Sequence, residues 1–110
     1  MAYDEELADR IRVLLDDAFD IDEQRMFGGL AFLAGGRMAI AVSGDGVMAR
    51  ARPEETVALL ELEGVGPFEM RGKALDGWLR VEPEAVDTRD DLEAWVQRGL
   101  SFARSLPPKD

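Results

Sequence analysis

The sequence contains neither cysteine nor histidine. Without cysteine, the chain cannot form a disulfide or a thiolate metal site. Without histidine, it lacks the general base of Ser-His and Cys-His nucleophile pairs, and a zinc site would have only carboxylate ligands, which is not the usual set. We therefore predict no enzymatic activity, no metal site and no cofactor.

Long hydrophobic runs are also absent. No apolar run approaches the roughly 18 residues of a membrane span, and residues 1–6 are acidic, unlike the basic start of a secretory signal peptide. Hydrophobic residues make up 46% of the 110 residues and charged residues 33%, a balance that is typical of a globular protein. We expect a cytoplasmic protein without a membrane segment, folded as one domain over residues 1–110.

Basic side chains are few, with 13 Lys and Arg against 23 Asp and Glu and a net charge of −10. Affinity for nucleic acid depends largely on neutralising phosphates, and an acidic chain repels a polyanion. Direct binding to nucleic acid is therefore not expected.

The acidic side chains gather near the N-terminus, as Asp16, Asp17, Asp20, Asp22 and Glu23. Calcium prefers such oxygen ligands. An EF-hand loop that started at Asp20, however, would have Arg25 where the turn glycine is required and Ala31 where the bidentate glutamate belongs. We interpret residues 16–23 as a helix end followed by a solvated loop.

Hydrophobic periodicity predicts three helices and five strands. A spacing of 3.6 residues indicates helices at 4–19 and 87–106, and Pro53 followed by two glutamates is typical of the start of a short helix at 53–62. Short β-like runs separated by turn residues indicate strands at 26–33, 38–43, 47–52, 68–73 and 77–82. Strands joined by short turns pair antiparallel. The predicted fold is α+β, with two layers, a mostly antiparallel five-stranded sheet with helices, and the order α-β-β-β-α-β-β-α.

Two glycine sites indicate close packing. Gly99 lies in the middle of the last predicted helix, where glycine costs about 1 kcal/mol relative to alanine. We therefore predict a close backbone contact between this helix and another element. Within the first predicted strand, Gly28 and Gly29 indicate a bulge or the close approach of a helix, with Met26 and Phe27 in the core.

Alternation along the strands predicts a mixed outer face of the sheet. If Phe68, Met70, Leu79 and Val81 face the core, their neighbours face outward. The predicted outer-face residues are Met48, Arg50, Arg52, Arg71, Lys73, Trp78 and Arg80. Arginine and aromatic side chains together are typical of the centres of protein interfaces. The alternative interpretation is a solvated face with one partly covered tryptophan.

Several segments resemble the TfoX N-terminal domain family. These are the opening 2–7, the stretch 25–32 with its Met-Phe-Gly-Gly sequence, the turn 42–46, the pair Gly77-Trp78 and the ending 94–109. Met-Phe-Gly-Gly is the most specific of them, and the similarity covers nearly the whole chain in order. The sequence is therefore identified as a member of this family, as a stand-alone N-terminal domain.

This resemblance implies a fold similar to that of bacterial secretion chaperones, with no known enzymatic activity or cofactor. The best-studied relatives regulate natural competence in proteobacteria, are linked to the cyclic-AMP receptor protein and carry a second, C-terminal domain. We therefore predict a non-enzymatic regulatory or adaptor module that acts through protein contacts. The alternative is a small-ligand-binding or weakly enzymatic domain with a pocket between helix and sheet.

The predicted outer face also favours self-association. It would present Ala39, Ala41, Met48 and Trp78 among charged side chains. A two-fold interface presents the same patch twice, so a surface of mixed charge can be self-complementary. We therefore expect a homodimer as well as a protein partner.

Overall fold

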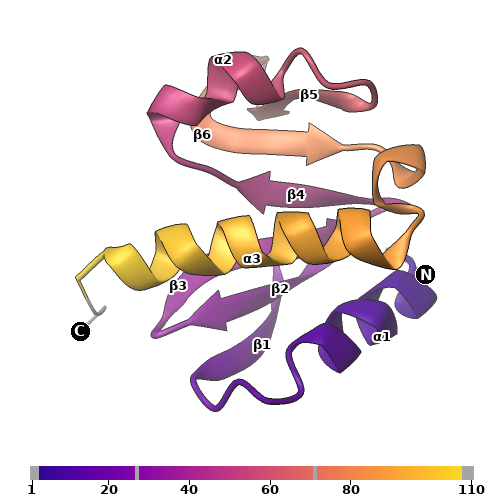
Figure 1. The fold of residues 1–110 in the computed structure, drawn as a ribbon, viewed down its shortest axis with the longest axis vertical. Coiled ribbons are helices and arrows are strands. Elements are labelled where there is room, and N and C mark those ends of the chain that lie inside the picture. Colours follow the sequence, from indigo (N-terminus) through magenta and orange to yellow (C-terminus); the bar gives the residue numbers. More distant parts are fainter. Residues whose placement is uncertain (1–2, 27, 71, 108–110) are drawn as a thin grey trace.

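The computed structural model describes residues 3–26, 28–70 and 72–107. Its helices are α1 (Glu5–Leu14), the 3-10 turn η1 (Pro53–Glu55) that leads into α2 (Thr56–Leu59), the 3-10 turn η2 (Pro83–Val86) and α3 (Arg89–Ser105). Its strands are β1 (Ile21–Met26), β2 (Gly29–Ala34), β3 (Arg37–Ser43), β4 (Gly46–Arg50), β5 (Val65–Met70) and β6 (Lys73–Val81). Figure 1 shows α3 crossing in front of the sheet, with α2 beside β5 and β6.

The strands form one antiparallel sheet in the order β1-β2-β3-β4-β6-β5. The predicted α+β class with an antiparallel sheet and three helices is confirmed. The predicted number of five strands is wrong, because the named strands number six and Tyr3 adds an isolated parallel bridge to Gly44. The predicted order is wrong as well, because four strands rather than three precede α2.

The strand that the sequence analysis missed is β1. It pairs over its whole length with β2, from Ile21 opposite Ala34 to Met26 opposite Gly29. Four successive residues of β1, Asp22 to Arg25, are exposed, and only its two ends are partly buried. An edge strand with both faces open to solvent shows no hydrophobic alternation, so its acidic sequence is typical of a loop.

Gly28 lies in the connection between β1 and β2. Gly28 has a φ of +73°, which suits a tight turn, and a Cβ on Gly29 would clash with the carbonyl oxygen of Val42 in β3. The close approach predicted for this glycine pair therefore exists, but the neighbour is a strand and not a helix. Met26 lies on the sheet face opposite the helices, and Phe27 lies outside the described residues.

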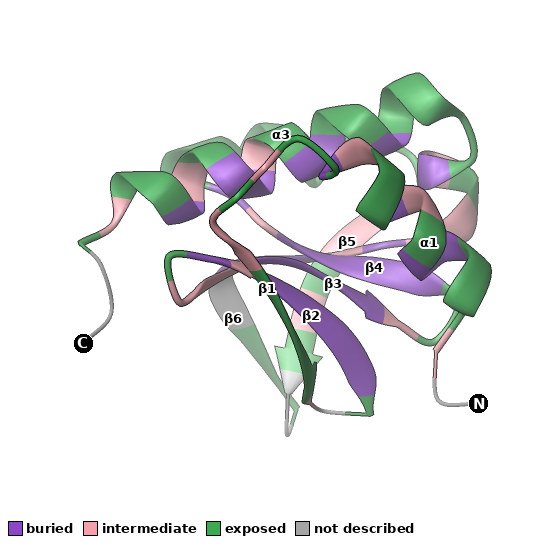
Figure 2. Cartoon of the chain, turned by 90° about the horizontal axis from the view of Figure 1, so that it is seen from below, coloured by how far each residue is buried: buried purple, intermediate pink, exposed green. Residues whose placement is uncertain are grey.

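The helices α1 and α3 cover one face of the sheet (Figure 2). Both begin at a capping side chain, because the Asp4 carboxylate accepts a bond of 3.1 Å from the Leu7 N–H and the Thr88 hydroxyl accepts one of 3.1 Å from the Asp91 N–H. Between helices and sheet lies the main core, whose largest fully buried side chains are Phe32, Ile11, Ile40, Leu79 and Leu92.

The close contact predicted for Gly99 is confirmed. A Cβ on Gly99 would overlap the carbonyl oxygen of Ala39 and lie 2.9 Å from its carbonyl carbon. At this point the pairing of β2 with β3 shifts, since Phe32 pairs with Ile40 but Leu33 pairs with Met38. Ala39 therefore sits in a bulge whose backbone touches α3.

None of the helices in the described part of the chain is both long and apolar enough to cross a membrane.

Candidate protein-binding surface

The sheet face that points away from the helices carries a second hydrophobic cluster. Ala31, Ala41 and Met48 are buried at its centre. Five partly buried side chains pack around them, namely Met26, Leu33, Met38, Phe68 and Trp78. We call these eight residues the outer-face cluster. It occupies a face for which the sequence predicted mainly charged side chains.

Strand pairing brings this cluster together from both halves of the sheet. Arg50 in β4 lies directly opposite Trp78 in β6, and Met48 lies opposite Arg80. Residues that face each other across an antiparallel pair project to the same side. In Figure 2 the ends of the β1–β2 and β5–β6 hairpins both extend away from the helices. Their apolar side chains therefore flank the small residues of β2 and β3.

Phe68 does not lie in the main core as predicted, but in the outer-face cluster. Strand β5 begins at Val65, three residues before its predicted start, and its pairing with β6 shifts between Pro67 and Glu69. Such an irregularity changes the face to which the following side chains point. The predicted strand 68–73 began inside this irregularity, so the premise that Phe68 faces the core was wrong.

The structure brings together only some of the predicted outer-face residues. Met48 is buried, Arg50 and Trp78 are partly buried, and Arg52 and Lys73 are exposed. Arg71 lies outside the described residues. Lys73 begins β6 at its hairpin with β5, five positions from Trp78, so it belongs to the hairpin end rather than to the centre of the face. Ala39 packs in the main core, whereas Ala41 belongs to the outer-face cluster.

Arg80 lies on the outer face but is bound within the fold. Its Nη1 donates a bond of 2.6 Å to the carbonyl oxygen of Ser43. Ion pairs join its Nη2 to Asp45 at 3.0 Å and its Nε to Glu82 at 3.2 Å. The guanidinium passes beside Gly46, where a Cβ would lie 3.0 Å from its Cζ. Arg80 therefore holds the β3–β4 turn against β6.

Arg50 provides the polar part of the surface. Its guanidinium carbon lies 4.6 Å from the ring centre of Trp78 and 5.0 Å from that of Phe102 in α3. Such stacking over aromatic faces is favourable for a cation. Burial, followed by repulsion from Arg37, lowers the pKa of Arg50. This cation is therefore partly desolvated before any partner arrives.

Two carboxylates of the α1–β1 region have shifted pKa values, and both shifts come from surface ion pairs. The hydrogen bond from Arg104 lowers the pKa of Asp20, and the bond from Arg12 lowers the pKa of Glu23. Neither carboxylate is buried. These shifts therefore indicate pairing within the fold and not a reactive group in a cleft.

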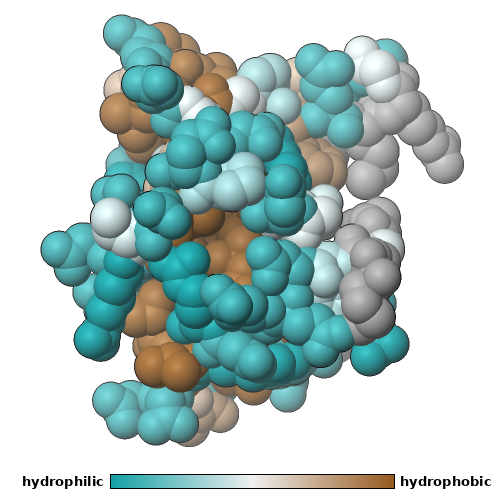
Figure 3. Space-filling model, turned by 90° about the vertical axis from the view of Figure 1, so that its right-hand side faces the viewer, coloured by the Kyte–Doolittle hydropathy of each residue, from teal (hydrophilic) through white to brown (hydrophobic). Residues whose placement is uncertain are grey.

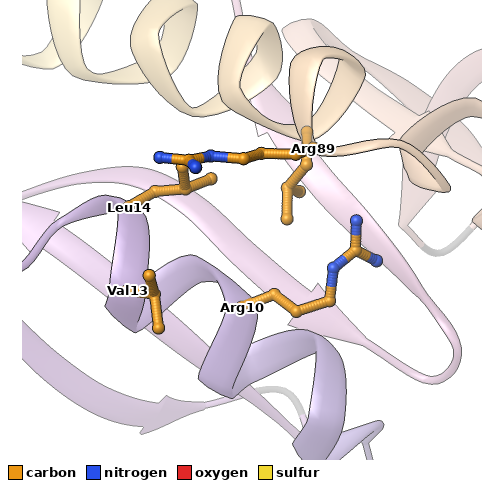
Figure 4. Close-up of a pocket in the computed structure, with 5 residues that line it drawn as sticks. Arg10, Val13, Leu14 and Arg89 are labelled. Carbon is orange, nitrogen blue, oxygen red and sulfur yellow. The ribbon is translucent and has the colours of Figure 1, made fainter.

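A mostly apolar hollow lies between α1 and α3. It has a volume of about 230 Å³ and is lined by Arg10, Val13, Leu14, Arg89 and Leu92. Figure 4 shows the two arginine side chains flanking it. Arg10 donates bonds of 2.9 Å and 3.1 Å to the carbonyl oxygens of Val86 and Asp87, so it ties α1 to the start of α3. On this side of the molecule, hydrophobic surface appears in separate patches between hydrophilic side chains (Figure 3).

The described residues bring no metal site together. No group of three or more acidic side chains in them could hold a metal ion. No polar or charged residue whose placement is described is buried. The acidic segment 16–23 that the sequence singled out lies in the connection after α1 and in the first half of β1, and it enters two of the surface ion pairs.

Comparison with known proteins identifies a family and a fold. The model of the TfoX N-terminal domain matches residues 13–103. No curated protein matches the chain significantly. The fold is similar to the crystal structure of a protein from Pseudomonas syringae, a Northeast Structural Genomics Consortium target, with a TM-score of 0.64 and 11% identity over 87% of this chain and 97% of that chain. At this identity the likeness shows the fold alone.

Proposed function

This chain belongs to the TfoX N-terminal domain family, and from that premise we propose that it is a non-enzymatic regulatory or adaptor module that binds a partner protein through the outer-face cluster. The association of the family with competence regulation fits a regulatory role. The partner binds to the sheet face opposite α1 and α3, because those helices already cover the other face.

The observation that carries this proposal is the outer-face cluster itself. Five large apolar side chains, including Met26, Met38 and Trp78, are only partly covered there. Methionine adapts its shape to different partners, and aromatic side chains contribute much of the energy of protein interfaces. A contiguous apolar patch of this kind on a small domain is typical of a binding surface.

No observation favours the small-ligand alternative. It required a pocket between helix and sheet with converging polar groups. In the part of the chain that the structure describes, that interface is filled by apolar side chains of the main core. The hollow between α1 and α3 lies at the rim, and the Arg10 guanidinium beside it is bonded to backbone carbonyls.

Partner capture should depend on Phe68 and not on a phenylalanine that is fully exposed elsewhere. We expect Phe68→Ser to reduce the capture of a specific protein from native cell extract by about tenfold, because aromatic side chains at an interface centre carry a large share of the affinity. The matched control is Phe19→Ser, since Phe19 is 99% exposed in the loop before β1. Quantitative mass spectrometry of the captured proteins measures the difference.

Two further measurements make this test decisive. Thermal unfolding of both variants shows whether Phe68→Ser acts through stability, and Met38→Ser repeats the test at another partly buried position of the outer-face cluster. Sedimentation of the wild type shows whether the captured partner is a second copy of the 12.2 kDa chain. Equal capture by folded Phe68→Ser and Met38→Ser variants would refute the proposal.

A further inference from the structure

Three arginines converge at the end of the sheet beside the outer-face cluster. Arg50 ends β4, Arg52 follows it, and Arg37 starts β3. The Nη1 of Arg50 donates a bond of 3.4 Å to the carbonyl oxygen of Met38, and the Nε of Arg37 donates one of 3.2 Å to that of Pro107. Arg52 has its guanidinium carbon 5.9 Å from the ring centre of Phe102. We call Arg37, Arg50 and Arg52 the arginine corner.

The arginine corner differs from the arginines of the molecule that form ion pairs. Arg12, Arg80 and Arg104 each pair with a carboxylate at 3.2 Å or less. Among the side chains that the structure describes, no carboxylate pairs with any member of the arginine corner. This is unexpected in a chain with a net charge of −10, where acids outnumber bases.

The free-energy cost of holding these three cations close together indicates that an external anion binds here. Like charges that approach one another repel, and a partly buried cation loses hydration. The pKa of Arg50 is lowered by both effects. The guanidinium of Arg50 stacks on Trp78 and Phe102. Its planar group of N–H donors matches the geometry of a carboxylate. An anion that docked here would compensate both costs.

The position of the corner decides between a peptide and a nucleic acid. Trp78 belongs both to the outer-face cluster and to the stack on Arg50, so the apolar and cationic surfaces are continuous. A polyanion would meet the repulsion of the whole chain, whose net charge is −10. A short acidic segment with apolar neighbours places only local charge at the corner and covers the adjoining methionine and aromatic side chains.

We propose that the arginine corner binds a carboxylate of an acidic peptide segment whose neighbouring apolar side chains lie on the outer-face cluster. This inference rests on the proposed function and specifies the chemistry of its partner. Arg50 is the central contact, because it alone of the three stacks on both Trp78 and Phe102. Arg37, whose charge acts on Arg50, and Arg52, which stacks on Phe102 as Arg50 does, add positive charge to the same corner.

A pair of synthetic peptides tests the carboxylate requirement. The probe is a rhodamine-labelled, C-terminally amidated peptide that alternates glutamate with phenylalanine and leucine, and its counterpart has glutamine in place of glutamate. We expect fluorescence anisotropy at low salt to show binding of the glutamate peptide about tenfold tighter than that of the glutamine peptide, since a hydrogen bond to a charged group contributes on this scale. Arg50→Gln should remove this preference.

The controls separate this inference from the proposed function. Arg89→Gln removes the same charge at the start of α3, about 20 Å along the helix from Phe102, and should keep the preference. Equal binding of both peptides, no binding of either, or an unchanged preference in Arg50→Gln would overturn the inference. Tighter binding of single-stranded DNA or inorganic phosphate at the same corner would also overturn it. Loss of capture by Phe68→Ser would still support the proposed function in each of these cases.

Discussion

Replacing Gly99 with alanine is expected to lower the midpoint temperature of unfolding by about 10 °C, although alanine is the better helix former. The added Cβ would overlap the carbonyl oxygen of Ala39, so α3 has to move away from the bulge in β3. Overpacking of a core costs about 1–3 kcal/mol. We expect the upper end of this range, because backbone atoms cannot change rotamer.

The gain in helix propensity offsets only part of this cost. Alanine is favoured over glycine by about 1 kcal/mol inside a helix, which leaves a net loss of about 2 kcal/mol. The matched control is Ser101→Ala, two positions along α3 and exposed, where the midpoint should stay the same or rise slightly. A Gly99→Ala protein that is as stable as the wild type would show that α3 does not touch the Ala39 backbone.

Arg80→Gln is expected to reduce the free energy of unfolding by about 2 kcal/mol, chiefly because the Ser43 carbonyl oxygen loses a charged donor at 2.6 Å. The two ion pairs add little, since the Asp45 and Glu82 side chains are 74% and 44% exposed. Glutamine is too short to restore all three contacts. Chemical denaturation of both proteins measures the difference.

The matched control for Arg80 is Arg52→Gln. Arg52 is exposed, and its side chain forms no hydrogen bond or ion pair with the described residues. Both substitutions remove one positive charge, so a general effect of net charge would appear equally in the two variants. An equal loss of stability in the two variants, or none in either, would contradict the role assigned to Arg80.

The sequence was informative where burial is one-sided. The helices α1 and α3 each have one apolar face and a capping side chain, Asp4 in α1 and Thr88 in α3, and both helices were predicted. In β4 and β6 the inward residues alternate with outward ones, so Trp78 and Arg50 were placed on the correct face. Regular periodicity and a local hydrogen bond are both visible in a single sequence.

The remaining features depend on contacts between distant residues. Strand β1 exists because β2 offers an edge, and its own exposed sequence from Asp22 to Arg25 carries no strand pattern. The shifts at Ala39 and Phe68 arise in pairing with a neighbouring strand, and each places a side chain on the face opposite to the expected one. Local spacing cannot reveal such a shift, because the bulge is a property of the strand pair.

The candidate surface was predicted in part. Met48, Arg50 and Trp78 do share the outer face, but the apolar contribution of Phe68 and of the methionines in β1 and β3 was missed. Arg37 was not singled out, because only the β2–β3 turn brings it beside Arg50. Among the described side chains, Arg80 pairs with Asp45 and Glu82, whereas no carboxylate pairs with the arginine corner. This difference could not be predicted, because it depends on the positions of carboxylates in the folded chain.

Photo-crosslinking in the native cell tests the central claim, partner binding through the outer-face cluster, most directly. Benzoylphenylalanine replaces Phe68 in one variant, Phe19 in a second and Val13 in a third, the last in the hollow between α1 and α3 where Val13 is 69% exposed. We predict that one specific protein, or a second copy of this chain, is crosslinked from position 68 and from neither of the other two. Crosslinks to one protein from position 13 or 19, with none from position 68, would contradict the account.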